Sequence, residues 1–464
     1  MDKQMHSRLN KVFLLCVFAG GHGVASHVYS ADWKGASSVT VSELYTDNKG
    51  LSHANKKSEF LTTIAPNVSL QGVGAKANLM LNASLEANSS NDSITPRLGA
   101  AADAELFEDL IFLDASVNIT QNTIDAFLPS GADSLNNTNN TTNVYNYQVS
   151  PYLIHRFKGL AEIVGRYTYN YQLSSDNSVD DTNSQNFLLS LNSGTDFSRL
   201  IWGTELNYSD SGSDSTNSEL LSTDVSLGYR FNRDWSITSS LGIESNDFVS
   251  SREENDGARW SMSAIWTPTS RSSLNIGYGD RFFGSVPTFD FTHRSRRSLI
   301  TASYSRELTD SADLLSQQSA FQTTSFFGEP IDPVADNSLS TINITRGVFV
   351  NEAFKLSYTL MGKRSSITVG ANHSIQKYED GRADETLETY DISMNRNISR
   401  KLAADAGYSL SQQRREGSVD AVTAKYSLGV TRKLGANSNL VFTYRLIDRE
   451  SEDLNNDYQE NRLQ

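Results

Sequence analysis

Apolar and polar residues alternate over residues 60–86 for longer than in most strands of water-soluble proteins. In the first half of this stretch, every second residue is mainly apolar, starting from Phe60. After Gly72 and Gly74, the second half carries apolar side chains on one face and Lys, Asn, Ser and Glu on the other. This pattern predicts a β-hairpin with one apolar face and one wet face. The apolar face consists of Phe60, Ile64, Pro66, Val68, Leu70, Ala75, Ala77, Leu79, Leu81, Ala83 and Leu85.

The same alternation repeats to the end of the chain. Counting its repeats predicts about 22 strands, within a range of roughly 20–24. A strand of about 9–11 residues, tilted by about 45°, crosses a bilayer, and apolar-out, polar-in alternation is typical of membrane barrels. We therefore expect an all-β fold, a transmembrane antiparallel up-and-down β-barrel. A soluble solenoid or propeller also has many strands, but it would not explain the asymmetry of the connections.

Connections between the predicted strands alternate between tight and long. Glu108-Asp109, Lys158-Gly159 and residues 232–234 are tight, whereas those between them are long, acidic and rich in Ser, Asn and Asp. Bacterial barrels have short periplasmic turns and longer outer loops. We therefore expect strict alternation, with the chain beginning in the periplasm. The first strand is expected at about Ser38 to Thr46, with Asp47-Asn48 lying outside the cell.

Residues 1–30 have the features of a signal peptide. Basic residues precede a short apolar run at 12–19, and small residues follow it. The only cysteine, Cys16, follows Leu15 rather than the small residue that a lipoprotein signal requires. Composition does not change sharply afterwards, so we assign residues 31–464 to one barrel.

Charge and composition exclude several functions. The net charge is −14 and mean hydropathy is −0.42, which speaks against a nucleic-acid partner and against a transmembrane helix. The histidines of the mature chain lie in a loop or share the parity of apolar neighbours, and acidic pairs such as Asp180-Asp181 lack the spacing of a calcium loop. We expect no enzymatic activity, no metal and no cofactor.

Residues 309–346 form the longest stretch without a strand pattern. Aromatic residues stand among prolines there, and plain disorder is usually poor in aromatic residues. We expect part of this stretch to fold into the lumen, where Glu329, Asp332 and Asp336 would line a narrowed, cation-preferring path. The alternative is an external lid that binds partners.

A basic block lies at a predicted periplasmic turn. Arg294, Arg296 and Arg297 stand close together and form a candidate docking site for an acidic periplasmic partner or a polymer. The alternative is that they are solvated turn residues near lipid phosphates.

Three blocks carry a resemblance to a known family. They are Val41–Asn48 followed by Ile64-Ala65-Pro66, then Arg281–Gly284 with His293–Arg297, and finally Tyr458–Arg462. In order and spacing they resemble the PEP-CTERM (exosortase) system-associated outer-membrane β-barrel proteins. The resemblance implies a barrel in the outer membrane of Gram-negative bacteria that make exopolysaccharide and sort PEP-CTERM proteins.

The resemblance implies no established activity, so the partners and the function are our own expectation from the barrel and its setting. The partners would be outer-membrane lipid and lipopolysaccharide, the barrel assembly machinery, and exopolysaccharide or periplasmic export components. The expected function is a channel associated with exopolysaccharide or PEP-CTERM protein export, and the alternative is a non-conducting structural or docking barrel. One departure is that the expected final strand with a terminal aromatic residue is missing after Arg462, so the closing strand looks truncated.

Overall fold

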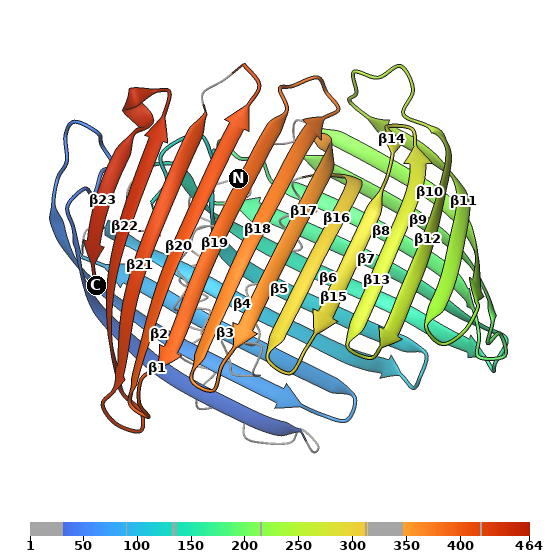
Figure 1. The fold of residues 1–464 in the computed structure, drawn as a ribbon, viewed down its shortest axis with the longest axis horizontal. Coiled ribbons are helices and arrows are strands. Elements are labelled where there is room, and N and C mark those ends of the chain that lie inside the picture. Colours follow the sequence, from blue (N-terminus) through green and yellow to red (C-terminus); the bar gives the residue numbers. More distant parts are fainter. Residues whose placement is uncertain are drawn as a thin grey trace.

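Twenty-two strands form one closed antiparallel barrel in the computed structural model (Figure 1). The structure describes residues 31–89, 91–131, 135–136, 138–213, 216–310, 313, 347–417 and 420–464, so the expected signal peptide lies outside the described residues. A further two-residue strand, β14, lies in the connection between β13 and β15. The strands are β1 (Asp32–Thr46), β2 (Glu59–Val73), β3 (Ala77–Asn88), β4 (Asn91–Phe107), β5 (Ile111–Thr123), β6 (Thr141–Phe157), β7 (Ala161–Ser174), β8 (Thr182–Ser193), β9 (Leu200–Ser213), β10 (Asn217–Arg230), β11 (Trp235–Phe248), β12 (Gly257–Thr269), β13 (Ser272–Arg281), β14 (Gly284–Ser285), β15 (Thr288–Arg294), β16 (Ser298–Asp310), β17 (Val348–Met361), β18 (Ser365–Tyr378), β19 (Glu385–Asn397), β20 (Leu402–Arg415), β21 (Ala421–Lys433), β22 (Asn439–Ser451) and β23 (Tyr458–Leu463).

The expected barrel and its strand number are confirmed. Each strand pairs with its neighbours in sequence, which is up-and-down topology. Among the described residues, helical structure is confined to the 3₁₀ turn η1 (Leu454–Asn456) and to Asp313. In the described part of the chain, no helix is long and apolar enough to cross a membrane.

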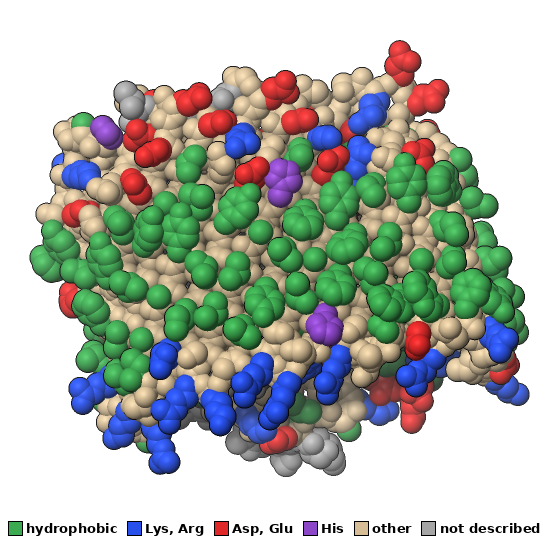
Figure 2. All heavy atoms as spheres, in the orientation of Figure 1, with side chains coloured by type: hydrophobic (Ala, Val, Ile, Leu, Met, Phe, Trp, Pro, Cys, Tyr) green, Lys and Arg blue, Asp and Glu red, His purple; other side chains and the backbone are tan. Residues whose placement is uncertain are grey.

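The period-two alternation places large apolar side chains on the outer face. Val225, Leu241 and Ile243 are 62%, 69% and 67% exposed, as expected for side chains that contact lipid rather than a protein core. Figure 2 shows an apolar belt across the face in view, with Lys and Arg along one edge and Asp and Glu along the other. Polar residues of the opposite parity face the lumen.

Turn geometry explains why one end of the barrel has short connections. Asp109 and Lys158 adopt positive φ values of 53° and 50°, which lets the chain reverse within a few residues. The expected alternation is not strict, however. At the long-loop end, β3 stops at Asn88 and β4 starts at Asn91, and β9 and β10 are joined by residues 214–216.

The barrel closes at a narrow seam between its first and last strands. β1 starts at Asp32, earlier than the predicted Ser38, and pairs with β2 along its whole length. β23 pairs with β1 only at Tyr45 and Thr46, near the long-loop end. Among the described residues, the rest of this β1 edge has no strand partner, so side chains must contribute to closure.

Candidate functional site in the barrel lumen

A segment between β5 and β6 lies against the inner wall at the seam. Leu135 of this segment packs with Leu44 of β1 and Leu61 of β2, and each is at most 5% exposed. We call residues 124–140 the inner segment; positions 132–134 and 137 lie outside the described residues. Because it lies on the lumen side of the wall, the inner segment narrows the lumen near its long-loop end.

Strands from the far end of the sequence anchor the inner segment. The Phe127 carbonyl oxygen accepts a 2.7 Å hydrogen bond from Arg449 Nη2, and the Ser130 carbonyl oxygen accepts one of 2.7 Å from the Tyr458 hydroxyl. The Arg415 guanidinium lies 4.1 Å from the centre of the Phe127 ring. The inner segment is therefore fixed to β20, β22 and β23. These strands are far from it in the sequence but lie close together around the wall.

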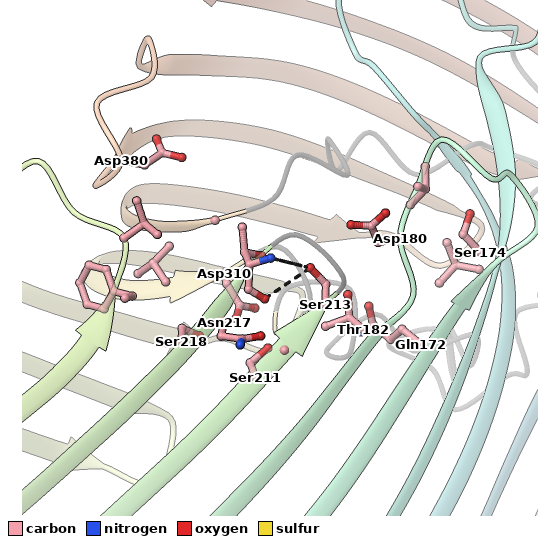
Figure 3. A pocket seen from close by; sticks show the side chains of 18 of the residues that line it. Gln172, Ser174, Asp180, Thr182, Ser211, Ser213, Asn217, Ser218, Asp310 and Asp380 are labelled. Atoms are coloured by element: carbon pink, nitrogen blue, oxygen red, sulfur yellow. Dashed lines mark hydrogen bonds between the residues drawn. The ribbon is translucent and has the colours of Figure 1, made fainter.

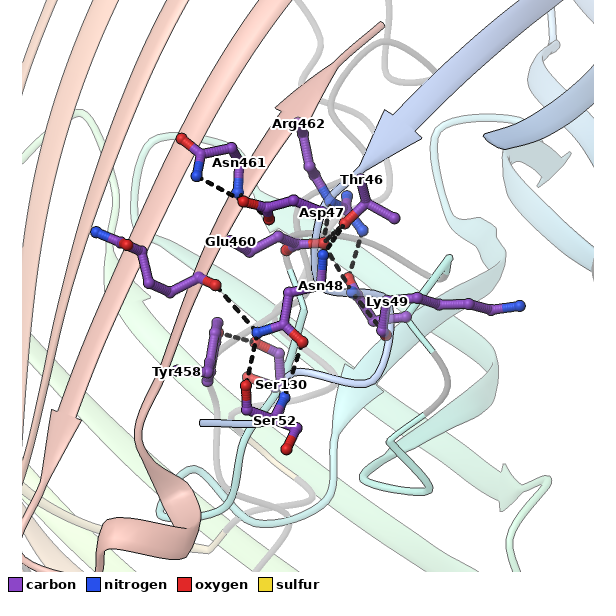
Figure 4. Close-up of polar contacts among 12 residues, drawn as sticks. Thr46, Asp47, Asn48, Lys49, Ser52, Ser130, Tyr458, Glu460, Asn461 and Arg462 are labelled. Carbon is purple, nitrogen blue, oxygen red and sulfur yellow. Dashed lines mark hydrogen bonds and ion pairs between the residues drawn. The ribbon is translucent and has the colours of Figure 1, made fainter. Parts of the chain in front are cut away.

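Buried polar side chains join the inner segment to both closing strands (Figure 4). Glu460 Oε1 accepts hydrogen bonds from Thr46 Oγ1 at 2.7 Å, Asn136 Nδ2 at 3.0 Å and Arg462 Nε at 2.8 Å. Arg462 also donates to the Asn136 carboxamide oxygen. The Glu460 and Arg462 side chains are 0% and 2% exposed. We call Thr46, Asn136, Glu460 and Arg462 the seam cluster.

The inner wall from β10 to β13 carries ion pairs. Arg259 of β12 donates to Asp224 of β10, with Nε to Oδ1 at 2.8 Å, and Arg281 of β13 donates to Glu244 of β11 at 3.0 Å. The Glu244 side chain is fully buried. Since both carboxylates are neutralised within the wall, this side of the lumen offers little net charge to a solute.

An aromatic pair faces the lumen on β5 and β6. The Phe112 and Tyr152 rings stack with their centres 5.1 Å apart and an interplanar angle of 17°. The Arg166 guanidinium lies 3.9 Å from the Tyr152 ring centre. Arg166 Nη1 also donates to Asp114 Oδ2 at 2.8 Å and to Ser150 Oγ at 2.9 Å, which fixes the arrangement.

A pocket, which we call the outer pocket, opens at the long-loop end of the same side of the barrel (Figure 3). Apolar side chains such as Phe248 and Val348 line it together with polar ones. Its lining includes Gln172, Thr182, Ser211 and Ser213, from the ends of β7, β8 and β9. Three carboxylates contribute to its rim, from Asp180, Asp310 and Asp380. This end of the lumen therefore offers hydroxyl and carboxamide groups beside acidic ones.

Asp313, in the connection between β16 and β17, shares a cavity with Arg166 and Arg281 of the inner wall. Its backbone N–H donates to Asp310 Oδ1 at 2.8 Å. Burial, followed by the negative charges of Asp310 and Glu307, raises the pKa of Asp313 to about 7. Asp313 therefore lies close to the wall, on the lumen side.

Some of the residues that the sequence analysis expected at functional sites lie outside the described residues, and the structure gives the position of the others. Glu329, Asp332 and Asp336 belong to the first group, so their predicted constriction stays a prediction. The three arginines of the basic block are exposed and lie in or beside the short turn between β15 and β16, as expected: Arg294, Arg296 and Arg297. Sequence reasoning missed the inner segment and the aromatic pair.

A closed wall of this size with a polar lumen defines a β-barrel of the outer-membrane type. No family model matches the sequence, and no curated protein matches it significantly. Solved structures show similarity of fold. The FrpB iron transporter from Neisseria meningitidis (F5-1 variant) aligns with a TM-score of 0.50 and 9% identity, over 92% of this chain and 81% of that chain.

Two further structures align over most of their length. The siderophore receptor PirA from Acinetobacter baumannii has a TM-score of 0.49 and 8% identity, over 94% of this chain and 80% of that one. A BenF-like porin from Pseudomonas fluorescens Pf-5 has a TM-score of 0.37 and 10% identity, over 94% and 98%. These proteins are receptors, transporters or porins by name, and the fold is that of Gram-negative outer-membrane barrels.

Proposed function

We propose that this protein is an outer-membrane channel that takes part in the export of exopolysaccharide or of sorted PEP-CTERM proteins. The observation that carries the proposal is the closed 22-strand wall around a polar lumen. Barrels of about 16–18 strands leave an aqueous channel, whereas those with about 22 strands are wide enough to hold a plug. In this barrel the inner segment supplies part of such an obstruction.

The short-turn end would face the periplasm, since bacterial barrels place their short turns there. The basic block belongs to a larger exposed rim at this end, in which only Asp196 and Asp234 of the turns from β8 to β22 are acidic. The rim consists of Arg199, Arg230, Arg233, Arg271, Arg294, Arg296, Arg297, Lys363, Arg364, Arg396, Arg400, Lys401, Arg432 and Lys433.

This basic rim would dock an acidic periplasmic partner or polymer. Replacing Arg294, Arg296 and Arg297 by Gln should weaken salt-sensitive binding of an acidic polymer, such as polygalacturonate, to the purified protein. Unchanged binding would favour the alternative in which these arginines only contact solvent and lipid phosphates.

Conductance in planar bilayers tests the channel itself. We expect the purified wild-type protein to conduct weakly. Asn136→Ala combined with Arg449→Ala should raise single-channel conductance, because both changes remove anchors of the inner segment. Glu450→Ala, an exposed change on the same strand as Arg449, is the matched control and should conduct like the wild type.

A non-conducting docking barrel is the second candidate. It is favoured by the burial of the seam cluster, because a segment held by a buried ion pair is costly to release. This candidate predicts no conductance from either the wild type or the anchor variant, while outer loops still bind surface polymer.

A further inference from the structure

The inner face of β5 to β9 consists of regular rows of hydrogen-bonding side chains. In the register of the sheet, Asn118 lies opposite Asn146, Asn146 opposite Gln172, and Gln172 opposite Thr182. The next row towards the short turns is made by Ser116, Gln148, Asn170, Ser184 and Ser211. Because neighbouring strands lie about 4.8 Å apart, the rows present carboxamides and hydroxyls at a regular spacing.

Several of these groups lack a partner within the described part of the chain. The carboxamide oxygens of Asn118, Asn146 and Asn170 and the Ser184 hydroxyl are buried and make no hydrogen bond there. Asn146, Asn170 and Ser184 are 5%, 5% and 2% exposed. A buried acceptor without a donor costs free energy, so these positions favour a ligand that brings its own hydroxyl donors.

The aromatic pair ends the rows on the short-turn side. Phe112 and Tyr152 lie opposite each other, and Tyr152 lies opposite Arg166 in the same row. Phe112 and the Arg166 guanidinium flank the Tyr152 ring, so a ligand can contact the Phe112 ring and the edge of Tyr152 beside an Asp–Arg pair. This surface suits a ring that has an apolar face and a hydroxylated edge. Asp114 and Arg166 are 39% and 32% exposed, so a ligand in the lumen can reach them.

The outer pocket ends the rows on the other side. Gln172, Thr182 and Ser213 belong to the Asn118 row and also line that pocket, as Figure 3 shows. The rows therefore run without a break from the aromatic pair to the long-loop mouth. Their only charged members, Asp114 and Arg166, are paired with each other. An uncharged ligand therefore fits them better than an anion.

We propose that the inner face of β5 to β9 binds an uncharged, hydroxyl-rich glycan chain, which packs against Phe112 and the edge of Tyr152 and follows the carboxamide rows to the outer pocket. This proposal rests on the proposed channel function, and it names the substrate class for that lumen. A peptide is the competing class, and it is treated as an outcome of the test.

Equilibrium binding to the detergent-solubilised full chain tests the proposal without requiring conductance. Isothermal titration with cellohexaose and maltohexaose should show binding of at least one of them to the wild type. Tyr152→Ala should weaken it by about tenfold, because it removes half of the aromatic pair that the ligand contacts, whereas Tyr152→Phe should retain most of the affinity. Asn146→Leu should also weaken binding. Thr368→Ala, on the opposite inner wall, is the matched control and should leave binding unchanged.

Heat-modifiable migration in gels verifies that each variant is folded before titration. The proposal is overturned if neither hexasaccharide binds at millimolar concentration, or if Tyr152→Ala and Asn146→Leu bind like the wild type. Tighter binding of hexagalacturonate or of a serine-glycine hexapeptide would overturn the uncharged glycan as the ligand class. Because titration does not depend on ion flow, a protein that binds glycan but does not conduct would refute the channel and leave this site intact.

Discussion

The seam cluster predicts that a single carboxylate controls the stability of the closed barrel. Glu460 has no exposed side-chain surface, and one of its oxygens accepts three hydrogen bonds from β1, the inner segment and β23. Glu460→Ala removes all three acceptor contacts. It also leaves the Arg462 guanidinium, which is 2% exposed, without its carboxylate.

The magnitude follows from the burial of the remaining charge. Breaking a buried ion pair by removing one partner typically costs about 3–5 kcal/mol, because an uncompensated charge remains. Glu460→Gln keeps a carbonyl oxygen for Thr46 and Asn136, so we expect a smaller loss. Glu450→Ala alters an exposed carboxylate on β22 and should change stability by no more than about 0.5 kcal/mol.

Urea unfolding in detergent micelles, followed by heat-modifiable migration, measures these differences. We expect the stability order wild type, Glu450→Ala, Glu460→Gln and Glu460→Ala, from most to least stable. If Glu460→Ala unfolds at the same urea concentration as Glu450→Ala, the seam cluster does not hold the barrel closed.

Two further predictions concern the wall and pH. Leu428→Arg places a charge on the lipid side near the middle of β21 and should lower the free energy of unfolding by about 2–4 kcal/mol. Ser427→Arg, one position away and facing the lumen, should leave it nearly unchanged. Equal losses of the two variants in the unfolding assay would contradict the assigned faces. Asp313 has a pKa of about 7 against an ordinary 3.8, so it is protonated when packed and ionised when released at intermediate pH. The stability that packed Asp313 contributes should therefore fall as pH rises from 3.8 towards 7 and stay constant above that. Asp313→Asn should remove this pH dependence. Identical pH profiles of unfolding for the wild type and Asp313→Asn would contradict the prediction.

The barrel could be predicted from sequence because its membrane face depends on a period of two. Lipid contacts every second residue, so apolar residues such as Leu79 and Leu81 identify strands without any knowledge of tertiary contacts. The start of β1 was predicted too late because Lys34, Gly35 and Ser37 do not alternate with apolar residues. Its pairing with β2 extends the strand across these positions.

The lumen was harder to predict because its contacts join distant parts of the chain. Phe127 and Leu135 stand in an Asn- and Thr-rich stretch, and this apolar pair was the available signal for the inner segment. Phe112 and Tyr152 also interrupt the polar parity of their strands, which marks an aromatic site in the lumen. The seam cluster, by contrast, joins residues 324 and 414 positions apart, and no local pattern encodes such contacts.

The seam cluster also has a consequence for the order of assembly. Its contacts close loops of 324 and 414 residues, and closing a long loop has an entropic cost that earlier contacts must already have offset. Asn136 can reach Glu460 only after the intervening strands have paired in register, since a slip anywhere would shift one partner along the wall. The cluster therefore forms last, and its formation distinguishes a completely assembled barrel from one that has lost or misaligned a hairpin.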